Sequence, residues 1–335
     1  MSTLILETLP ILDLDHPGSN DQEYRIRRAI IAKAAIDFHR EKRLKRREGD
    51  KKATKGSKET RESNKGTREG HKYASEGNKE AKKSDEHIEE YNEVEHDKEQ
   101  QIPTITYTTE EHQTWEIINK TLTPLHQKWA CEIYLEGRKK VTIDPHRIPQ
   151  LQDLNQILKL FNFRLEPVHG LVLPRIFLQE VGNGTMLCTQ YIRHPSNPFF
   201  TPEPDVVHEI LGHVPMFTSQ EVNELQIIIG KAANKATEQQ LTALNRLYWY
   251  SIEYGLIEEQ GEIKAFGAGL LGGIKDLTNA MTGQCIIKPF TIKEVIATDY
   301  NYSFEQPHFF VIQSLPMLVE NVKNFIKEWK LGNEK

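Results

Sequence analysis

The chain has 335 residues, of which 38% are hydrophobic and 27% are charged, and its formal net charge at pH 7 is −5. This composition is ordinary for a soluble protein of one or two domains and excludes a general electrostatic attraction to nucleic acid. No apolar run approaches the roughly 18 residues of a membrane span, and the N-terminus lacks the pattern of a secretory signal. Cys131, Cys188 and Cys285 form no C-x-x-C pair, which fits a reducing compartment. We therefore expect a cytoplasmic protein without a membrane or nucleic-acid partner.

Residues 1–40 contain one turn and one helix, and they are interpreted as the N-terminal part of the main domain. Asp15-His16-Pro17-Gly18 is a turn signal. Between Glu23 and His39, alanine and isoleucine recur at helical spacing, which predicts a helix.

Residues 41–100 differ from both neighbouring regions, because Lys, Arg, Glu, Gly, Ser and Asn dominate and the few apolar residues show no period. Such a segment cannot bury enough apolar surface to offset its ordering entropy, so we predict a charged, disordered insertion. Its first half is mostly basic and residues 85–99 are mostly acidic. A self-neutralising surface loop is therefore favoured over an arm that binds nucleic acid or a protein partner.

Residues 101–335 are interpreted as the main part of the same domain as residues 1–40. Their patterns predict an α+β fold that is mainly α with a small β component. Helices are expected over 110–135 (with a break near Pro124), 148–160, 221–236, 237–255 and within 311–329. Strands are expected over 102–107, within 163–172 and over 186–192. The glycines between 267 and 273 predict close backbone approach, because no G-x-x-x-x-G-K phosphate loop is present.

The most informative stretch is PDVVHEILGHVP, which covers residues 204–215. His208 and His213 are five positions apart, which on an ideal α-helix points their side chains about 140° away from each other. Gly212 and Pro215 predict that the helix ends between them, so that His213 can turn back beside His208. The zinc-protease pattern H-E-x-x-H has a spacing of four, so this is a different motif.

Glu253 is the candidate for a third ligand, since it is the single carboxylate in an aromatic and aliphatic run from 247 to 256. An unpaired carboxylate is costly to bury unless it is hydrogen-bonded, neutralised or bound to a metal. Two histidines and one carboxylate form the facial triad of non-heme Fe(II) sites, although zinc accepts the same ligand types. The competing interpretation takes His208 as a helix cap and His213 as a hydrogen-bonded interior histidine.

Further motifs lie in order along the chain. They are DHPG (15–18), YRIRR (24–28), IPQL (148–151), TQYIRH (189–194), TPEPD (201–205) and KAFGAG (264–269). Together with the histidine motif they resemble the pterin-dependent aromatic amino acid hydroxylases, especially the short bacterial phenylalanine hydroxylases. The resemblance covers residues 10–40 and 101–325 and implies the catalytic-domain fold of that family. Members of the family lack the insertion found here between these two regions.

The resemblance implies a monooxygenase that uses Fe(II), tetrahydrobiopterin or a related tetrahydropterin, and O₂ to hydroxylate the ring of a free aromatic amino acid. Phenylalanine is the first candidate, and its conversion would give tyrosine. The implied iron ligands are His208, His213 and Glu253. The implied pterin-binding residues are Val168, Gly170, Phe177, Leu178, Glu209 and Tyr248, with Glu209 also catalytic. The implied substrate-binding residues are Arg193, Thr201, Pro202, Trp249, Gly269 and Gly272, with Arg193 on the substrate carboxylate.

Three positions depart from the family pattern and imply a changed activity or substrate preference. Gly272 occupies a position where the family usually has Ser, and Leu187 one where His is common. Tyr302 occupies a position where the family generally has a smaller residue. The same chemistry on tyrosine or tryptophan is an alternative, with Trp249 favouring phenylalanine or tyrosine. Two other classes of protein remain as alternatives. One is a zinc hydrolase with the same metal ligands, and the other is a binding protein that contacts a partner through the insertion. The tetramerisation segment of the animal enzymes is not recognised, so we expect a monomer.

Overall fold

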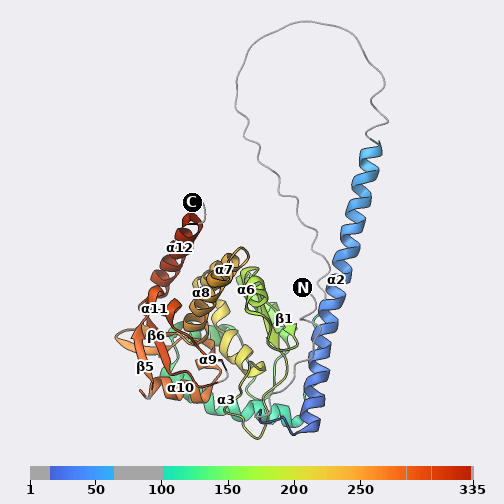
Figure 1. The fold of residues 1–335 in the computed structure, drawn as a ribbon. Coiled ribbons are helices and arrows are strands. Elements are labelled where there is room, and N and C mark those ends of the chain that lie inside the picture. Colours follow the sequence, from blue (N-terminus) through green and yellow to red (C-terminus); the bar gives the residue numbers. More distant parts are fainter. Residues whose placement is uncertain (1–15, 64–100, 284, 303, 333–335) are drawn as a thin grey trace. The chain divides into compact units, whose positions relative to one another are not determined.

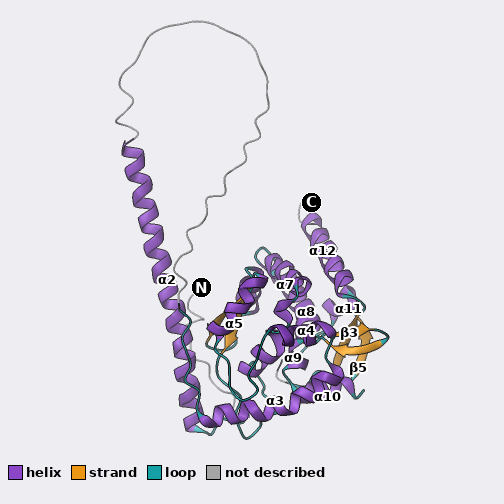
Figure 2. Ribbon diagram, turned by 180° about the vertical axis from the view of Figure 1, so that it is seen from behind, coloured by secondary structure: helices purple, strands orange, loops and turns teal. Residues whose placement is uncertain are grey.

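The structure is a computed structural model that describes residues 16–63, 101–283, 285–302 and 304–332. The chain divides into two compact units, one formed by residues up to 38 with those from 102 on, and one formed by residues 39–101. Helices dominate the larger unit and strands are few and short (Figure 2). The predicted α+β class with a small β component is therefore confirmed.

The first helix of the described chain, α2, runs from Gln22 to Ser63 and includes the helix predicted over 23–39. It continues through residues 41–63, so the prediction that these residues are disordered was wrong. Lys, Arg and Glu are frequent here and are good helix formers, so a helix can form without an apolar face. Residues 64–100 of the predicted insertion and Asp15 of the predicted turn lie outside the described residues.

The helix predicted over 110–135 begins at a capping box, in which the Thr108 side chain accepts from the N–H of Glu111 and the Glu111 side chain accepts from the N–H of Thr108. This helix, α3 (Thr109–Trp129), continues through Pro124 without the predicted break. The chain leaves the helix at Ala130, which is extended (φ −73°, ψ 150°). The next helices are α4 (Glu132–Lys140) and α5 (Leu151–Leu158), followed by a 3₁₀ turn, η1 (Lys159–Phe161).

Two small sheets accompany the helices. Strands β1 (Arg164–Val168) and β2 (Thr185–Thr189) are parallel and are connected through α6 (Pro174–Gly182), which confirms the strands predicted in these two regions. A four-stranded sheet that was not predicted has the order β4-β3-β6-β5. Its strands are β3 (Leu256–Glu259), β4 (Glu262–Ala265), β5 (Ile286–Pro289) and β6 (His308–Ile312).

The strand predicted over 102–107 does not form. A side chain takes the place of a strand partner there, since Gln150 accepts from the N–H of Ile105 at 2.9 Å and donates to its carbonyl at 3.0 Å. The alternating pattern thus describes an extended segment whose backbone groups are satisfied without a sheet.

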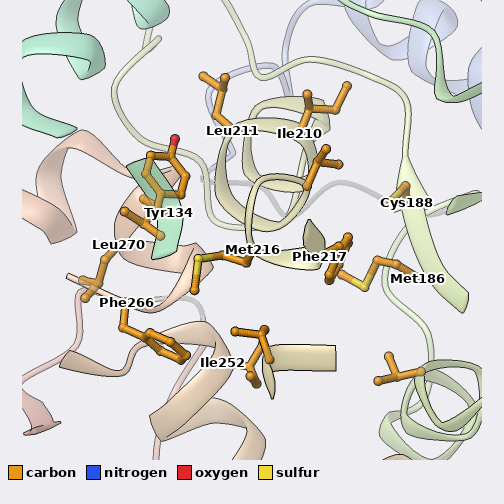
Figure 3. Packing of buried hydrophobic residues seen from close by; sticks show 14 of the residues in the cluster. Tyr134, Met186, Cys188, Ile210, Leu211, Met216, Phe217, Ile252, Phe266 and Leu270 are labelled. Carbon is orange, nitrogen blue, oxygen red and sulfur yellow. The ribbon is translucent and has the colours of Figure 1, made fainter. Parts of the chain in front are cut away.

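The remaining helices complete the larger unit (Figure 1). They are α7 (Gln220–Ala233), α8 (Glu238–Tyr248), α9 (Ala268–Leu271), α10 (Ile274–Met281), α11 (Ile292–Ala297) and α12 (Leu315–Gly332). Side chains from β2, from the segment around residue 210 and from α9 converge on one hydrophobic core (Figure 3). All three cysteines are free. Within the described ranges, no helix has both the length and the apolar character that a membrane span requires.

Helices α6 and α7 touch through two glycines. A Cβ atom placed on Gly230 would lie 2.3 Å from the backbone N of Gly182, far inside normal contact. The two backbones can approach this closely only because neither residue has a side chain. This contact sets the position of α6, which carries Phe177.

We expect Gly230→Ala to lower the free energy of unfolding by about 1–3 kcal/mol, because overpacking forces the two backbones apart. Urea unfolding followed by circular dichroism measures the change. Lys231→Ala on the exposed side of the same helix is the control, with an expected effect within about 0.5 kcal/mol. Equal stability of the two variants would contradict this account of the contact.

Candidate metal centre and its cavity

Both segments that carry the predicted metal ligands are π-helical turns, η2 (His208–His213) and η4 (Trp249–Glu253). Their hydrogen bonds join residues five apart, with the N–H of Val214 donating to the carbonyl of Glu209 at 3.3 Å. The N–H of Tyr254 likewise donates to the carbonyl of Trp249 at 2.7 Å. A turn of this width brings side chains five positions apart to the same face. The structure therefore brings His208 and His213 together.

The predicted helix end at Gly212 was wrong, although His213 does lie beside His208 as predicted. Val214 keeps helical dihedral angles (φ −57°, ψ −42°), and so does Pro215 (φ −61°, ψ −35°). Gly212 serves packing instead, because a Cβ atom there would lie 2.5 Å from the carbonyl oxygen of Ala268 in α9. The wide turn, and not a helix stop, aligns the imidazoles.

Glu253 completes a compact group with the two histidines. The Nε2 atoms of His208 and His213 are 3.1 Å apart, and the Glu253 oxygens lie 3.4 Å from the first and 3.3 Å from the second. Two ligand atoms each about 2.1 Å from a metal ion, at right angles to one another, lie roughly 3.0 Å apart. The spacing and the chemistry of these three groups fit ligands of one metal ion.

A second carboxylate, Glu209, lies close to the same histidines, with ligand atoms of the three residues within 4.8 Å of one another. Its Oε1 accepts hydrogen bonds from the N–H and the hydroxyl of Thr189 at 3.1 and 3.2 Å. Its buried Oε2 has no hydrogen-bond partner among the described residues. The shorter distances favour Glu253 as the third ligand and leave Glu209 as a neighbouring carboxylate with a free oxygen.

Burial and charge shift the pKa values of this group in different directions. Burial favours the neutral form of Glu253, but the two imidazoles outweigh it and hold its pKa well below the usual range. Burial also opposes a charge on His208, yet Glu253 raises the pKa of that imidazole, while burial prevails at His213 and lowers its pKa. Burial raises the pKa of Glu209 to about 7 against the opposing effect of His208. The charged carboxylate of Glu253 between two imidazoles is an arrangement that a cation stabilises.

A cavity of about 400 Å³ opens beside the three ligands. Of the predicted site residues, those that line it are Val168, Gly170, Phe177, Arg193, Thr201, Pro202, His208, Glu209, Tyr248, Trp249, Glu253, Gly269 and Gly272. His213 does not line the cavity and is 1% exposed, which suits a ligand on the closed side of an ion. Leu178 is fully buried in the core and does not reach the cavity, because it points about 100° away from Phe177 on α6.

Arg193 lines the cavity and is held by a buried carboxylate that was not predicted. Its Nε and Nη2 donate to Asp205 at 2.9 and 2.7 Å, and its backbone N–H donates to the same carboxylate at 2.7 Å. Asp205 also accepts from the N–H of His208 at 3.1 Å, as an N-cap residue does three positions before that N–H. Its place just before the histidine motif was the signal that could have identified it.

Several other cavity residues were not predicted as site residues, and three of them carry aromatic or charged side chains near Trp249, Gly269 and Gly272. Tyr300 stacks on Trp249 with ring centroids 4.0 Å apart, and Tyr254 packs against Gly269. Asp276 in α10 also lines the cavity. No local spacing links these residues to the histidine motif, so only the fold brings them to the site.

The family model of the biopterin-dependent aromatic amino acid hydroxylases matches residues 1–60 and 60–332. The chain belongs to this family. The predicted family and its catalytic-domain fold are thereby confirmed. A crystal structure of the Chromobacterium violaceum phenylalanine hydroxylase with bound iron(III) and oxidized cofactor 7,8-dihydrobiopterin is similar, with a TM-score of 0.63. The sequences are 27% identical, and the match covers 68% of this hydroxylase-family chain and 84% of that one.

Two curated relatives in the family differ in their named reaction. The chloroplastic phenylalanine 4-monooxygenase of Pinus taeda is 39% identical over 236 residues, which are 69% of this chain and 66% of that protein. The tyrosine 3-monooxygenase of Schistosoma mansoni is 30% identical over 328 residues, which are 96% of this chain and 58% of that protein. This family member thus spans less than two thirds of the length of either relative.

The two carboxylates can be told apart by metal binding. We expect Glu253→Gln to weaken Fe(II) binding by more than about 100-fold, because it removes a ligand, whereas Glu209→Gln should cost less than about tenfold. Anaerobic Fe(II) titration of both variants measures the difference. A larger loss in Glu209→Gln would reverse the assignment of the third ligand.

The buried Arg193–Asp205 pair should matter far more for stability than an exposed pair of the same kind. We expect Asp205→Asn to lower the free energy of unfolding by about 3 kcal/mol, since it leaves a buried guanidinium without its counter-charge. Asp299, which pairs with Arg246 and has an 89% exposed side chain, provides the control. Asp299→Asn should cost less than about 1 kcal/mol. Chemical denaturation measures both, and similar losses would refute the contrast.

Proposed function

We propose that this family member is an Fe(II)- and tetrahydropterin-dependent monooxygenase that hydroxylates the ring of a free aromatic amino acid. Phenylalanine, with tyrosine as the product, is the first candidate substrate. The observation that carries the proposal is the group of His208, His213 and Glu253 beside the cavity, with 3.1–3.4 Å between the two Nε2 atoms and from each to Glu253.

The ligand set supports iron. Two histidines and a carboxylate on one side of an ion leave its other positions open, which suits the binding of O₂ by non-heme Fe(II). His208 and Glu253 line the cavity whereas His213 does not, so the open positions would face the cavity. The iron in the related Chromobacterium violaceum structure supports the same metal here.

The residues around Glu209 fit a pterin. A pterin is a flat ring system with several N–H groups, so it needs a flat surface and hydrogen-bond acceptors. Phe177 provides an aromatic ring in the cavity wall, and its contact with Tyr248 fixes that ring edge to face at 5.3 Å. The free Oε2 of Glu209 provides a buried acceptor. Val168, the last residue of strand β1, and Gly170 complete this wall.

The opposite part of the cavity fits an amino acid. Asp205 holds the Arg193 guanidinium through Nε and Nη2, and the described residues provide no acceptor for Nη1. Nη1 is therefore available for a substrate carboxylate. Trp249, fixed by its stack on Tyr300, provides a surface for the substrate ring. Thr201 and Pro202 close the cavity from the loop before the metal ligands.

When bound, iron and tetrahydropterin supply the O₂ activation and the electrons that no side chain can provide. The role of the protein is to orient the substrate and to exclude water from the cavity. Arg193 fixes the carboxylate end of the amino acid, so that its ring points toward the open side of the ligand group. Glu209, with a pKa raised to about 7 by burial, can hold or release a proton beside His208.

Relatives named for both phenylalanine and tyrosine are similar to this chain, so the choice of phenylalanine is the finer part of the proposal. The higher identity to the phenylalanine 4-monooxygenase supports it. The bulk of Trp249 and Tyr300 in the cavity favours a single-ring side chain over the larger indole of tryptophan.

The test is product formation from phenylalanine, tyrosine and tryptophan with Fe(II) and O₂, with and without tetrahydrobiopterin. We expect tyrosine from phenylalanine only when the pterin is present. His213→Ala should lower the rate at least roughly 100-fold, because a metal ligand is lost. His146→Ala is the matched control, since His146 is 66% exposed and should leave the rate unchanged.

Product from none of the three amino acids, with folding and bound iron verified, would refute the proposal. An O₂-independent hydrolysis that requires zinc would instead identify the same ligands as those of a hydrolase.

A further inference from the structure

Asp276 is a partly buried carboxylate in the cavity wall that neither the metal ligands nor the pterin wall uses. The backbone N–H of Gln306 favours its charged form. Within the described residues, no ion pair joins it to a lysine, arginine or histidine. The neighbouring Glu305 differs, since it pairs with Lys275 and accepts from the Asn279 amide at 2.6 Å.

Asp276 lies close to the group that would bind the substrate carboxylate. Nη2 of Arg193 donates to the carbonyl of Gly272 at 3.3 Å, and a Cβ atom on the next residue, Gly273, would lie 3.5 Å from Oδ2 of Asp276. Burial raises the pKa of the Tyr254 phenol, and the charge of Asp276 raises it further while Arg193 opposes the shift. The Arg193 guanidinium and the Asp276 carboxylate thus lie beside Gly272 and Gly273, two neighbouring residues of the cavity wall.

The other carboxylates that line the cavity already have partners. Glu203 pairs with Arg28 and with His16, and Glu253 lies between the two histidines. Glu209 accepts from Thr189 beside the metal ligands. Glu209 and Asp276 are therefore the two cavity carboxylates that form no ion pair in the described part of the chain. Glu209 lies beside the metal ligands, whereas Asp276 lies beside Gly273, next to the Gly272 carbonyl that Arg193 contacts.

A free α-amino acid carries an ammonium group next to its carboxylate, and burying that ammonium without an anion is costly. We propose that Asp276 binds the α-ammonium group of the substrate while Arg193 binds its carboxylate. Together the two residues select free α-amino acids over aromatic acids that lack the amine. This inference rests on the proposed function, since it takes a free amino acid as substrate.

The pKa of Asp276 agrees with this role. Burial raises it to about 6, with a further contribution from Glu305, because no nearby cation compensates fully. The carboxylate is still ionised at neutral pH and can meet a cationic ligand.

The test compares phenylalanine with 3-phenylpropanoate, which has the same ring and carboxylate but no ammonium. In the iron-loaded enzyme we expect Asp276→Asn to raise the KM for phenylalanine roughly 10- to 100-fold, as loss of a charged hydrogen bond does. The inhibition constant of 3-phenylpropanoate and the KM for tetrahydrobiopterin should change less than about threefold. Glu305→Gln, which removes a neighbouring carboxylate outside the cavity lining, is the control and should change none of the three.

Equal changes for phenylalanine and 3-phenylpropanoate, or no change for phenylalanine, would overturn the role of Asp276. Absence of hydroxylated product from the wild-type enzyme would refute the proposed function instead. If the wild-type enzyme gives no product, calorimetric titration of the iron-loaded protein with phenylalanine and with 3-phenylpropanoate still tests whether Asp276 binds the ammonium group. A wild-type protein that does not prefer phenylalanine in this titration would overturn the inference.

Discussion

The wide hydrogen-bonded turn at His208–His213 is the constraint on which the site depends. In an α-helix the two imidazoles would point about 140° apart, and no single ion could bind both. A π-helical turn is rare and is found mostly at functional sites. Here it is fixed from outside, by the fully buried Ile210 and Leu211 and by the close contact of Gly212 with Ala268. A second π-helical turn brings Glu253 to the same point, so two unusual turns meet at the metal site.

Asp205 joins this metal site to the substrate end of the cavity. One carboxylate caps the turn that begins the histidine segment and also holds the guanidinium of Arg193. The orientation of Arg193 is therefore tied to the backbone that positions His208. A substrate carboxylate bound at Arg193, as proposed, would be located relative to the metal through one fully buried group, which is how a protein holds two reactants in a fixed geometry.

Local patterns predicted the helices over 23–39 and 148–160, the strands around β1 and β2, and the close approach of His208, His213 and Glu253. These features depend on spacing and on residue types close together in the chain. The rules for Pro and Gly failed at Pro124, which lies inside α3, and at Gly212, where packing against Ala268 takes the place of a helix end. The four-stranded sheet pairs β3 with β6 from far along the chain, through strands of four or five residues with little pattern of their own. Asp276 had no local signal at all.

The departures from the family pattern affect the cavity surface more than the ligands. At Gly272 a Cβ atom would lie 2.8 Å from the Cα of His208, so the absence of a side chain lets this backbone approach the metal turn and offer its carbonyl to Arg193. Tyr302 lines the cavity but is 58% exposed, which places it toward solvent, whereas the Trp249–Tyr300 stack lies deeper. Under the proposed function the buried ligands would determine the chemistry, so variation at Gly272 and Tyr302 would change which aromatic amino acid fits without changing the reaction.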